Sequence, residues 1–177
     1  MIKVENVTKK FNDFTAIDNL NLEISEGEIF GLLGENGAGK TTTLRILATM
    51  LKPTQGKATV CGYDTVKDDA KVRENIGILF GGETGLYDRL TARENIEYFG
   101  ELYDMSKDEL KKEIEKVAEA LSMKEYIDKR VGTFSKGMKQ KVAFARSIIH
   151  NPKVLLLDEP TSGLDVTAAV EVHNFIK

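Results

Sequence analysis

The chain has 177 residues, with 25 basic and 28 acidic side chains and a formal net charge of −3. This length suits one domain, and the acidic balance argues against a nucleic-acid-binding protein, which usually presents a basic stripe. The single cysteine, Cys61, favours a reduced, cytosolic setting, the N-terminus lacks the apolar core of a signal peptide, and no apolar run approaches the roughly 18 residues that span a bilayer.

The first 33 residues are expected to form strands. Leu20, Leu22 and Ile24 alternate with polar residues, which predicts a half-buried strand. A turn at residues 26–28 is followed by the apolar run 29–33, which we interpret as a second short strand.

A glycine-rich loop at residues 34–41 carries the clearest chemistry. The sequence GENGAGKT matches GxxxxGK[ST] and lies between the expected strand 29–33 and a helix predicted from Thr41 to Leu51. Backbone N–H groups of such a loop turn toward phosphate oxygens, Lys40 would bridge the β- and γ-phosphates, and the Thr41 hydroxyl would ligate Mg²⁺. The candidate nucleotide-binding residues of this loop are Gly34, Glu35, Asn36, Gly37, Ala38, Gly39, Lys40, Thr41 and Thr42.

Strands are then expected at 57–61 and 76–80, and the character changes after them. Residues 91–94 and 106–109 each match a helix capping box. The second helix would place Leu110, Ile114, Val117 and Leu121 on one apolar face. These patterns predict a helical insertion over residues 85–135.

An unbroken apolar run, residues 154–157, predicts a strand buried on both faces that ends in two acids. Asp158 would stand at the carboxyl end of this strand, where α/β sheets place their ligands, and would hold Mg²⁺. Glu159 would act as the general base on the attacking water, a role worth about 10²–10⁴-fold in rate. With the phosphate loop, this strand indicates an NTPase, and the lack of an Asn-Lys-x-Asp segment disfavours GTP.

The run Phe134-Ser135-Lys136-Gly137-Met138 opens a further predicted helix and resembles the LSGGQ signature of ABC ATPases. Residues 161–165 resemble the D-loop of that family, with Ser162, Gly163, Leu164 and Asp165 as its members, and Phe11 fits the aromatic that stacks on adenine. The resemblance covers essentially the whole chain. It implies an α/β P-loop NTPase core with an antiparallel β edge at the N-terminus and an inserted α-helical subdomain, divided into a nucleotide-binding core (1–84 and 136–177) and a helical part (85–135).

The resemblance also implies partners and a mechanism. ATP and Mg²⁺ would be bound in a head-to-tail dimer of identical or similar subunits, with Ser135, Lys136, Gly137 and Met138 contacting the γ-phosphate of the partner's nucleotide. Ser135 could equally be only a helix cap, and Lys136 is expected on a solvated face rather than in a nucleic-acid patch.

An integral membrane permease would complete the transporter, with this chain on the cytoplasmic face of the membrane. Leu86, Tyr87 and Leu90, in the segment 85–96, are expected to be exposed for that contact, although they could instead pack the helical insertion. The cargo would be an exported small solute or ion, with sodium as the first candidate. The alternatives are a soluble ABC ATPase acting on ribosomes or DNA, and a regulatory domain that binds nucleotide without hydrolysis.

Two departures from the family pattern concern turnover. The family has a glutamine after the strand that ends here at Phe80, whereas this chain has Glu83, as an oxygen ligand or as a simple loop carboxylate. The switch histidine is not matched by His173, and His150 suits a helix end. The chain ends inside a helix predicted from about Val166, so we expect a truncated domain that binds ATP better than it hydrolyses it.

Overall fold

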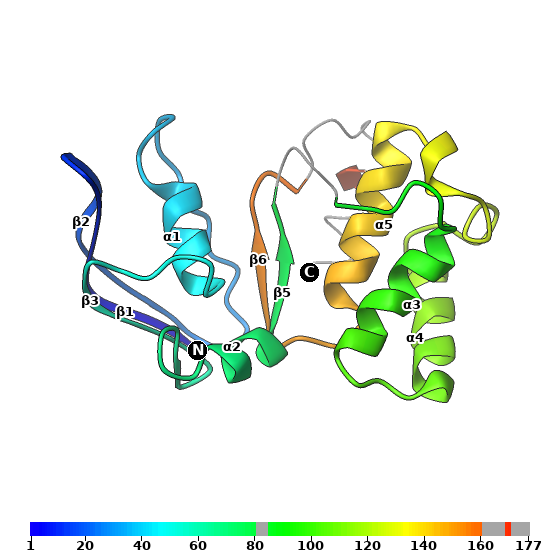
Figure 1. Ribbon diagram of the computed structural model, residues 1–177, viewed down its shortest axis with the longest axis horizontal. Helices are drawn as coiled ribbons and strands as arrows, with labels where there is room; N and C mark the ends of the chain where they lie inside the picture. Colours follow the sequence, from blue (N-terminus) through cyan, green and yellow to red (C-terminus); the bar gives the residue numbers. More distant parts are fainter. Residues whose placement is uncertain (81–84, 161–168, 171–177) are drawn as a thin grey trace. The chain divides into compact units, whose positions relative to one another are not determined.

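The computed structural model describes residues 1–80, 85–160 and 169–170. The chain forms two compact units, Met1–Ile76 and Gly77–Lys177, and each is considered by itself below (Figure 1). The functional division predicted above, with a helical part at 85–135, stays a prediction.

The first unit is built on an antiparallel sheet in the order β2-β1-β3-β4. Its strands are β1 (Ile2–Phe11), β2 (Phe14–Ile24), β3 (Gln55–Val60) and β4 (Tyr63–Asp64). The β1–β2 hairpin pairs Ile2 with Ile24 at one end and Phe11 with Phe14 at the other. Asn12 forms the turn with φ 50°, a conformation that asparagine tolerates better than most residues. The antiparallel edge and the strands predicted at 20–24 and 57–61 are therefore confirmed.

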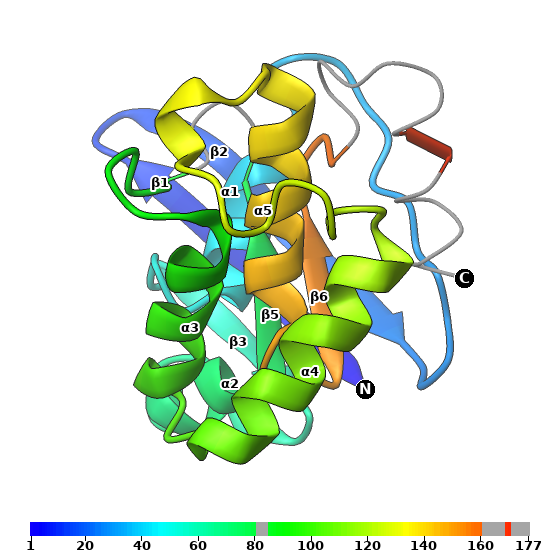
Figure 2. The same ribbon diagram turned by 90° about the vertical axis from the view of Figure 1, so that its right-hand side faces the viewer.

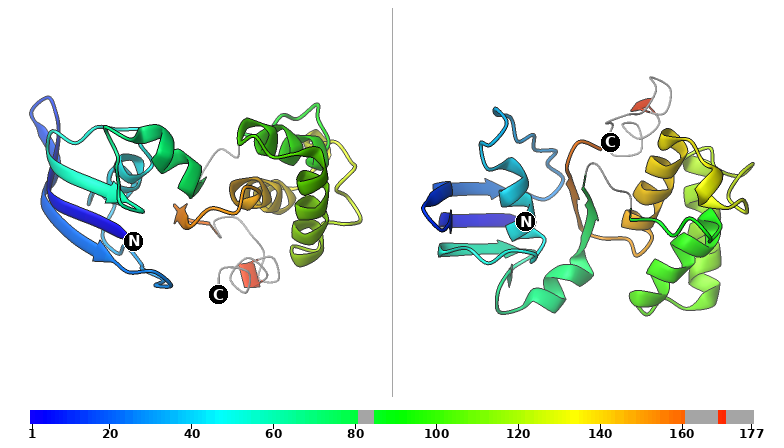
Figure 3. Two further views of the ribbon diagram at one scale, coloured as in Figure 1. Left: turned by 90° about the horizontal axis from the view of Figure 1, so that it is seen from below. Right: turned by 45° about the horizontal axis from the view of Figure 1, so that its top comes forward.

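Two helices accompany this sheet. Helix α1 (Lys40–Leu47) packs on β2 and β3 (Figure 3), and α2 (Asp69–Asn75) contacts β4. Leu44, Ile46 and Leu47 of α1 are buried, which explains why a helix of only eight residues persists. The helix predicted from residue 41 is confirmed, although it ends four residues before Leu51.

The strand predicted at residues 29–33 is wrong. The structure has no regular secondary structure there, and Ile29, Phe30 and Leu33 are exposed. An apolar run indicates that a segment favours burial, but a strand also needs a neighbouring strand to form hydrogen bonds with. Within the described part of the chain, no strand pairs with residues 29–33.

The second unit joins a two-stranded sheet to a group of helices. Strand β5 (Ile76–Leu79), which starts at the boundary, pairs with β6 (Val154–Leu157), as expected for both runs. The helices are α3 (Ala92–Leu102), α4 (Lys107–Ala120) and α5 (Lys136–Ile148), with a 3₁₀ turn, η1 (Val131–Thr133), before α5. Figure 2 shows the three helices together, and their buried faces share one apolar core with Leu79 of β5 and Leu155 and Leu157 of β6.

In this unit the two predicted capping boxes are confirmed, and the predicted burial of β6 is not. Both capping boxes are formed, at Thr91 with Glu94 and at Ser106 with Glu109. Strand β6 is not buried on both faces as predicted, because only Leu156 is buried while its neighbours are half-buried. In the described sheet β6 has one hydrogen-bonded neighbour, β5.

Candidate functional site

The phosphate loop closes around the amine of Lys40. Its Nζ donates hydrogen bonds to the carbonyl oxygens of Gly34, at 2.6 Å, and Glu35, at 2.8 Å. Ala38 N donates to Glu35 O at 3.2 Å, so the loop is a compact turn that leads directly into α1. The loop is thus folded around the cation that would meet the phosphates of a nucleotide.

Gly39 explains why this loop needs glycine. It caps α1 with φ 82°, in the left-handed region, and it is buried. A Cβ atom at this position would lie 2.5 Å from the carbonyl oxygen of Ala16 and 3.1 Å from Cγ1 of Ile17. The bare backbone therefore lets the loop rest directly on β2.

The first turn of α1 offers its positive end to an anion. It holds no acidic residue. The first backbone N–H groups of a helix have no acceptor within the helix, so they can donate to an anion. Thr43, the third hydroxyl in this stretch, donates to Gly39 O at 2.9 Å and is buried, so it serves the helix rather than a ligand. Thr41 and Thr42 are half-buried in the same turn, where a hydroxyl can act as an oxygen ligand for Mg²⁺.

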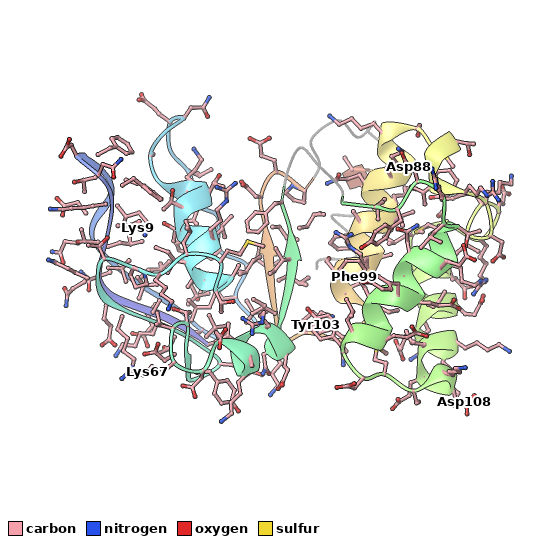
Figure 4. The ribbon with its side chains drawn as sticks, in the orientation of Figure 1. Lys9, Lys67, Asp88, Phe99, Tyr103 and Asp108 are labelled. Carbon is pink, nitrogen blue, oxygen red and sulfur yellow. The ribbon has the colours of Figure 1, made fainter. Side chains whose placement is uncertain are left out.

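Phe11 lies at the end of β1, beside the hairpin turn. Its ring is 42% exposed, and the Lys9 amine, labelled in Figure 4, lies 4.9 Å from the ring centroid. Phe14, its partner across the hairpin, is 61% exposed and was not named from the sequence. Both side chains are exposed, and Phe14 is two residues from Ala16, whose carbonyl lies close to Gly39.

The second unit holds the acidic pair. Asp158 N donates to Leu79 O at 2.8 Å, which continues the β5–β6 pairing past the end of β6. Asp158 is half-buried, and Glu159 is exposed with φ 49°, a left-handed conformation unusual for a glutamate. Among the described residues no cluster of three or more acidic, histidine or cysteine side chains could hold a metal ion.

Ser135 caps helix α5. Its Oγ accepts a hydrogen bond from Met138 N at 3.2 Å, so the capping role considered from the sequence is confirmed. Lys136 is exposed in the first turn, and no acidic residue lies there. The turn that resembles the signature is therefore an ordered helix start with basic character.

Comparison with known proteins decides the family. The model of the ABC transporter family matches residues 17–162, which include the phosphate loop, the helical segment and the acidic pair. The chain belongs to the ABC transporter family of ATP-binding proteins.

Relatives of this ABC ATPase agree along its length. It is 51% identical to the ABC transporter ATP-binding protein NatA of Bacillus subtilis, over 100% of this chain and 74% of the relative. It is 38% identical to the bacitracin transport ATP-binding protein BcrA of Bacillus licheniformis, over 99% of this chain and 56% of that protein. A dimeric structure of the ATP-binding cassette MJ0796, in a post-hydrolysis state with ADP and Pi, superimposes with a TM-score of 0.87 at 32% identity, covering 99% of this chain and 81% of that one.

The segment expected to meet a permease is held by Asn95 of α3. This side chain is fully buried, accepts from Tyr87 N at 2.8 Å, and donates to Tyr87 O at 3.1 Å and Thr91 O at 2.8 Å. The Asn95 amide thus pairs with Tyr87 as a neighbouring strand would. The signal for this role in the sequence is an amide next to the apolar Ile96.

Exposure within that segment differs from the expectation. Tyr87 is 49% exposed, and its ring packs edge-on against Tyr98 with centroids 5.4 Å apart. A hydrogen bond that the Tyr98 hydroxyl donates to Tyr87 raises the pKa of the Tyr98 phenol. Leu86 packs partly buried against the core of this unit and Leu90 is half-buried, so the prediction that both are exposed is wrong. Asn95 holds the segment to α3, and Leu86 packs against the apolar core.

Arg146 of α5 is a further residue that sequence reasoning missed. Its guanidinium lies 4.2 Å from the centroid of the Phe99 ring (Figure 4) and donates to Gly85 O at 2.8 Å. Burial lowers the pKa of Arg146, because removal from water disfavours the charged guanidinium. Lys139, about two turns earlier, pairs with Asp88 at 2.8 Å. Helix α5 is therefore fastened to residues 85–88 at two points.

Other candidate residues lie outside the described part of the chain: Glu83, Ser162, Gly163, Leu164, Asp165 and His173. His150 stacks on Tyr103, with centroids 3.7 Å apart, just past the end of α5, as expected for a residue at a helix end. Within the described residues, no helix combines the length and apolar character needed to cross a membrane.

Proposed function

We propose that this ABC ATPase binds and hydrolyses ATP to drive export of a small solute or ion through a separate permease. The observation that carries the proposal is the phosphate loop, whose lysine amine sits on two loop carbonyls at the positive end of α1. The names of the relatives, which include transport and resistance ATP-binding proteins, favour transport over a soluble role on ribosomes or DNA.

Each residue would have one task in this reaction. The backbone N–H groups of residues 34–42 and the Lys40 amine would bind the phosphates, and Phe11 would stack on adenine. The Thr41 hydroxyl and the Asp158 carboxylate would ligate Mg²⁺, both hard oxygen donors of the kind this ion prefers. Mg²⁺ would supply charge neutralisation of the phosphates, and Glu159, exposed beyond β6, would take the proton of the attacking water.

The catalytic unit would be a dimer of identical or similar chains. The dimeric cassette structures that resemble this chain support this arrangement. Ser135, Lys136, Gly137 and Met138, with their N–H groups at the start of α5, would contact the γ-phosphate of the partner's nucleotide. Glu83 would replace the family's glutamine as an oxygen ligand, and residues 162–165 would form the D-loop.

The permease would be an integral membrane protein that contacts Tyr87 and its neighbours from the membrane side, leaving this chain peripheral on the cytoplasmic face. The exposed Tyr87–Tyr98 pair supplies an aromatic contact of the kind enriched at protein interfaces. Sodium is the first cargo to test, because the FSKGM run at 134–138 and the FGGE run at 80–83 resemble those of bacterial exporter ATPases, among them sodium-extrusion systems.

One pull-down tests the transporter assignment. Membranes carrying the full-length protein with Glu159→Gln are solubilised in mild detergent with ATP and Mg²⁺, and copurifying proteins are identified. Lys40→Ala provides the matched control that should not be locked by ATP. Recovery of an integral membrane protein is the expected result, whereas ribosomes or nucleic acid alone would replace transport with the soluble role.

The cargo needs a separate measurement. Inside-out vesicles that hold the ATPase and its permease should accumulate ²²Na⁺ on addition of ATP, and vesicles with Glu159→Gln should not. ATP hydrolysis in these vesicles without sodium uptake would keep the transporter assignment and exclude sodium as the cargo.

A further inference from the structure

Gln140 is a buried polar side chain of α5 that none of the roles above uses. It is 6% exposed, and its Nε2 donates a hydrogen bond to the carbonyl oxygen of Pro160 at 3.2 Å. A carbonyl oxygen can only accept, so the amide N–H is the group that must face it. The bond joins the signature helix to the residue directly after Glu159.

Glu159 is held between two anchors. On one side Asp158 N donates to Leu79 O at 2.8 Å, and on the other Pro160 O accepts from Gln140. Between them Glu159 keeps φ 49°, a conformation that glutamate does not favour by itself. Backbone conformations of this kind persist where the surroundings impose them, so the second anchor contributes to the direction in which the Glu159 carboxylate points.

Helix α5 is suited to carry a displacement from its start to this anchor. Gln140 lies five residues after Ser135, the cap of the helix, and Val142, Ala143 and Phe144 next to it are fully buried. A close-packed helix moves as a body rather than bending, because its buried side chains have no free volume around them.

We propose that Gln140 is a positioning residue that makes the orientation of Glu159 depend on whether the Ser135 end of α5 is engaged by nucleotide. The inference rests on the proposed function, in which Ser135 meets the partner's ATP while Glu159 acts on the ATP of its own chain. Each nucleotide site would then sense the occupancy of the other through a hydrogen bond inside one subunit. Gln140 contacts no reacting atom in this scheme, so its loss affects turnover and cooperativity rather than ATP binding.

The test compares Gln140→Met and Gln140→Glu with Ser147→Ala in the full-length ATPase. Methionine keeps the length of the side chain without a donor, and glutamate sets a carboxylate oxygen against the Pro160 carbonyl. Ser147 is an equally buried polar residue of α5, but its Oγ bonds to Phe144 O within the same helix, so its loss weakens the helix without touching residue 160.

For both Gln140 variants we expect kcat to fall about 5- to 10-fold, as for loss of one hydrogen bond, and the Hill coefficient for ATP to move toward 1. Binding of a fluorescent ATP analogue, measured in the Glu159→Gln background, should change less than about 2-fold. Ser147→Ala should keep the wild-type Hill coefficient.

Four results would overturn the inference. Wild-type kcat and Hill coefficient in Gln140→Met would show that the bond to Pro160 does not position Glu159. Equal changes in Ser147→Ala would assign the effect to helix stability. A wild-type enzyme that hydrolyses ATP without cooperativity would remove the coupling but leave the proposed function intact, whereas no hydrolysis at all would remove both.

Discussion

Replacing Asn95 by alanine should destabilise the second unit, because it removes a buried, hydrogen-bonded side chain of α3. The side chain makes three hydrogen bonds, two to the backbone of Tyr87 and one to Thr91 O, and it is fully buried. At about 0.5–1.5 kcal/mol each, their loss sums to about 3 kcal/mol, and the N–H of Tyr87 is left without its acceptor.

Urea unfolding followed by circular dichroism measures this free energy, and a thermal scan should show a midpoint about 6–12 °C lower. Asn75→Ala is the matched control, because the Asn75 amide makes one exposed hydrogen bond, to Lys71 O. The control should stay within about 0.5 kcal/mol of wild type. An Asn95→Ala protein as stable as this control would refute the idea that the amide holds residues 87–91 in place.

Three further outcomes are expected. Gly39→Ala should lower ATP affinity by at least about 10-fold in equilibrium binding, because its Cβ would meet Ala16 O in a left-handed backbone, and wild-type affinity would contradict the loop geometry. Ser106→Ala should cost α4 about 1 kcal/mol in urea unfolding, and a neutral result would mean that the capping box adds nothing. The hydrogen bond that Arg93 donates lowers the pKa of Asp128. Because the Asp128 side chain of this ion pair is exposed, the pair should contribute less than about 1 kcal/mol to stability at neutral pH. That contribution should shrink as pH falls below about 4 and through the lowered pKa of folded Asp128, and a difference between Asp128→Asn and wild type that does not diminish between pH 6 and pH 2 would contradict it.

Interactions between residues close in the sequence could be predicted from it, whereas the pairing of distant segments could not. Thr91 with Glu94 and Ser106 with Glu109 form their capping boxes because each box is complete within four residues. The strand predicted at 29–33 was wrong because apolar composition does not indicate which strand, if any, pairs with the segment.

Within the candidate site the same distinction holds. The loop around Lys40 follows from contacts between near neighbours, and its lysine reaches carbonyls five and six residues away. The bond from Gln140 to Pro160 spans 20 residues, and the bond from Arg146 to Gly85 spans 61. A glutamine or an arginine in the sequence does not indicate a distant backbone partner of this kind, because amide and guanidinium groups are equally suited to a solvated helix face.

The two compact units are each continuous in sequence, and this has a consequence for how the protein is made. Residues 1–76 leave the ribosome before any of residues 77–177 exist as a complete unit. At about 5–20 residues per second, the second unit takes roughly 5–20 s to synthesise, which is long compared with the folding of a small domain. The antiparallel sheet and the phosphate loop can therefore form during translation, while the acidic pair beyond β6 is made later. Cellular ATP can meet a folded phosphate loop before the residues that would hydrolyse it have been synthesised.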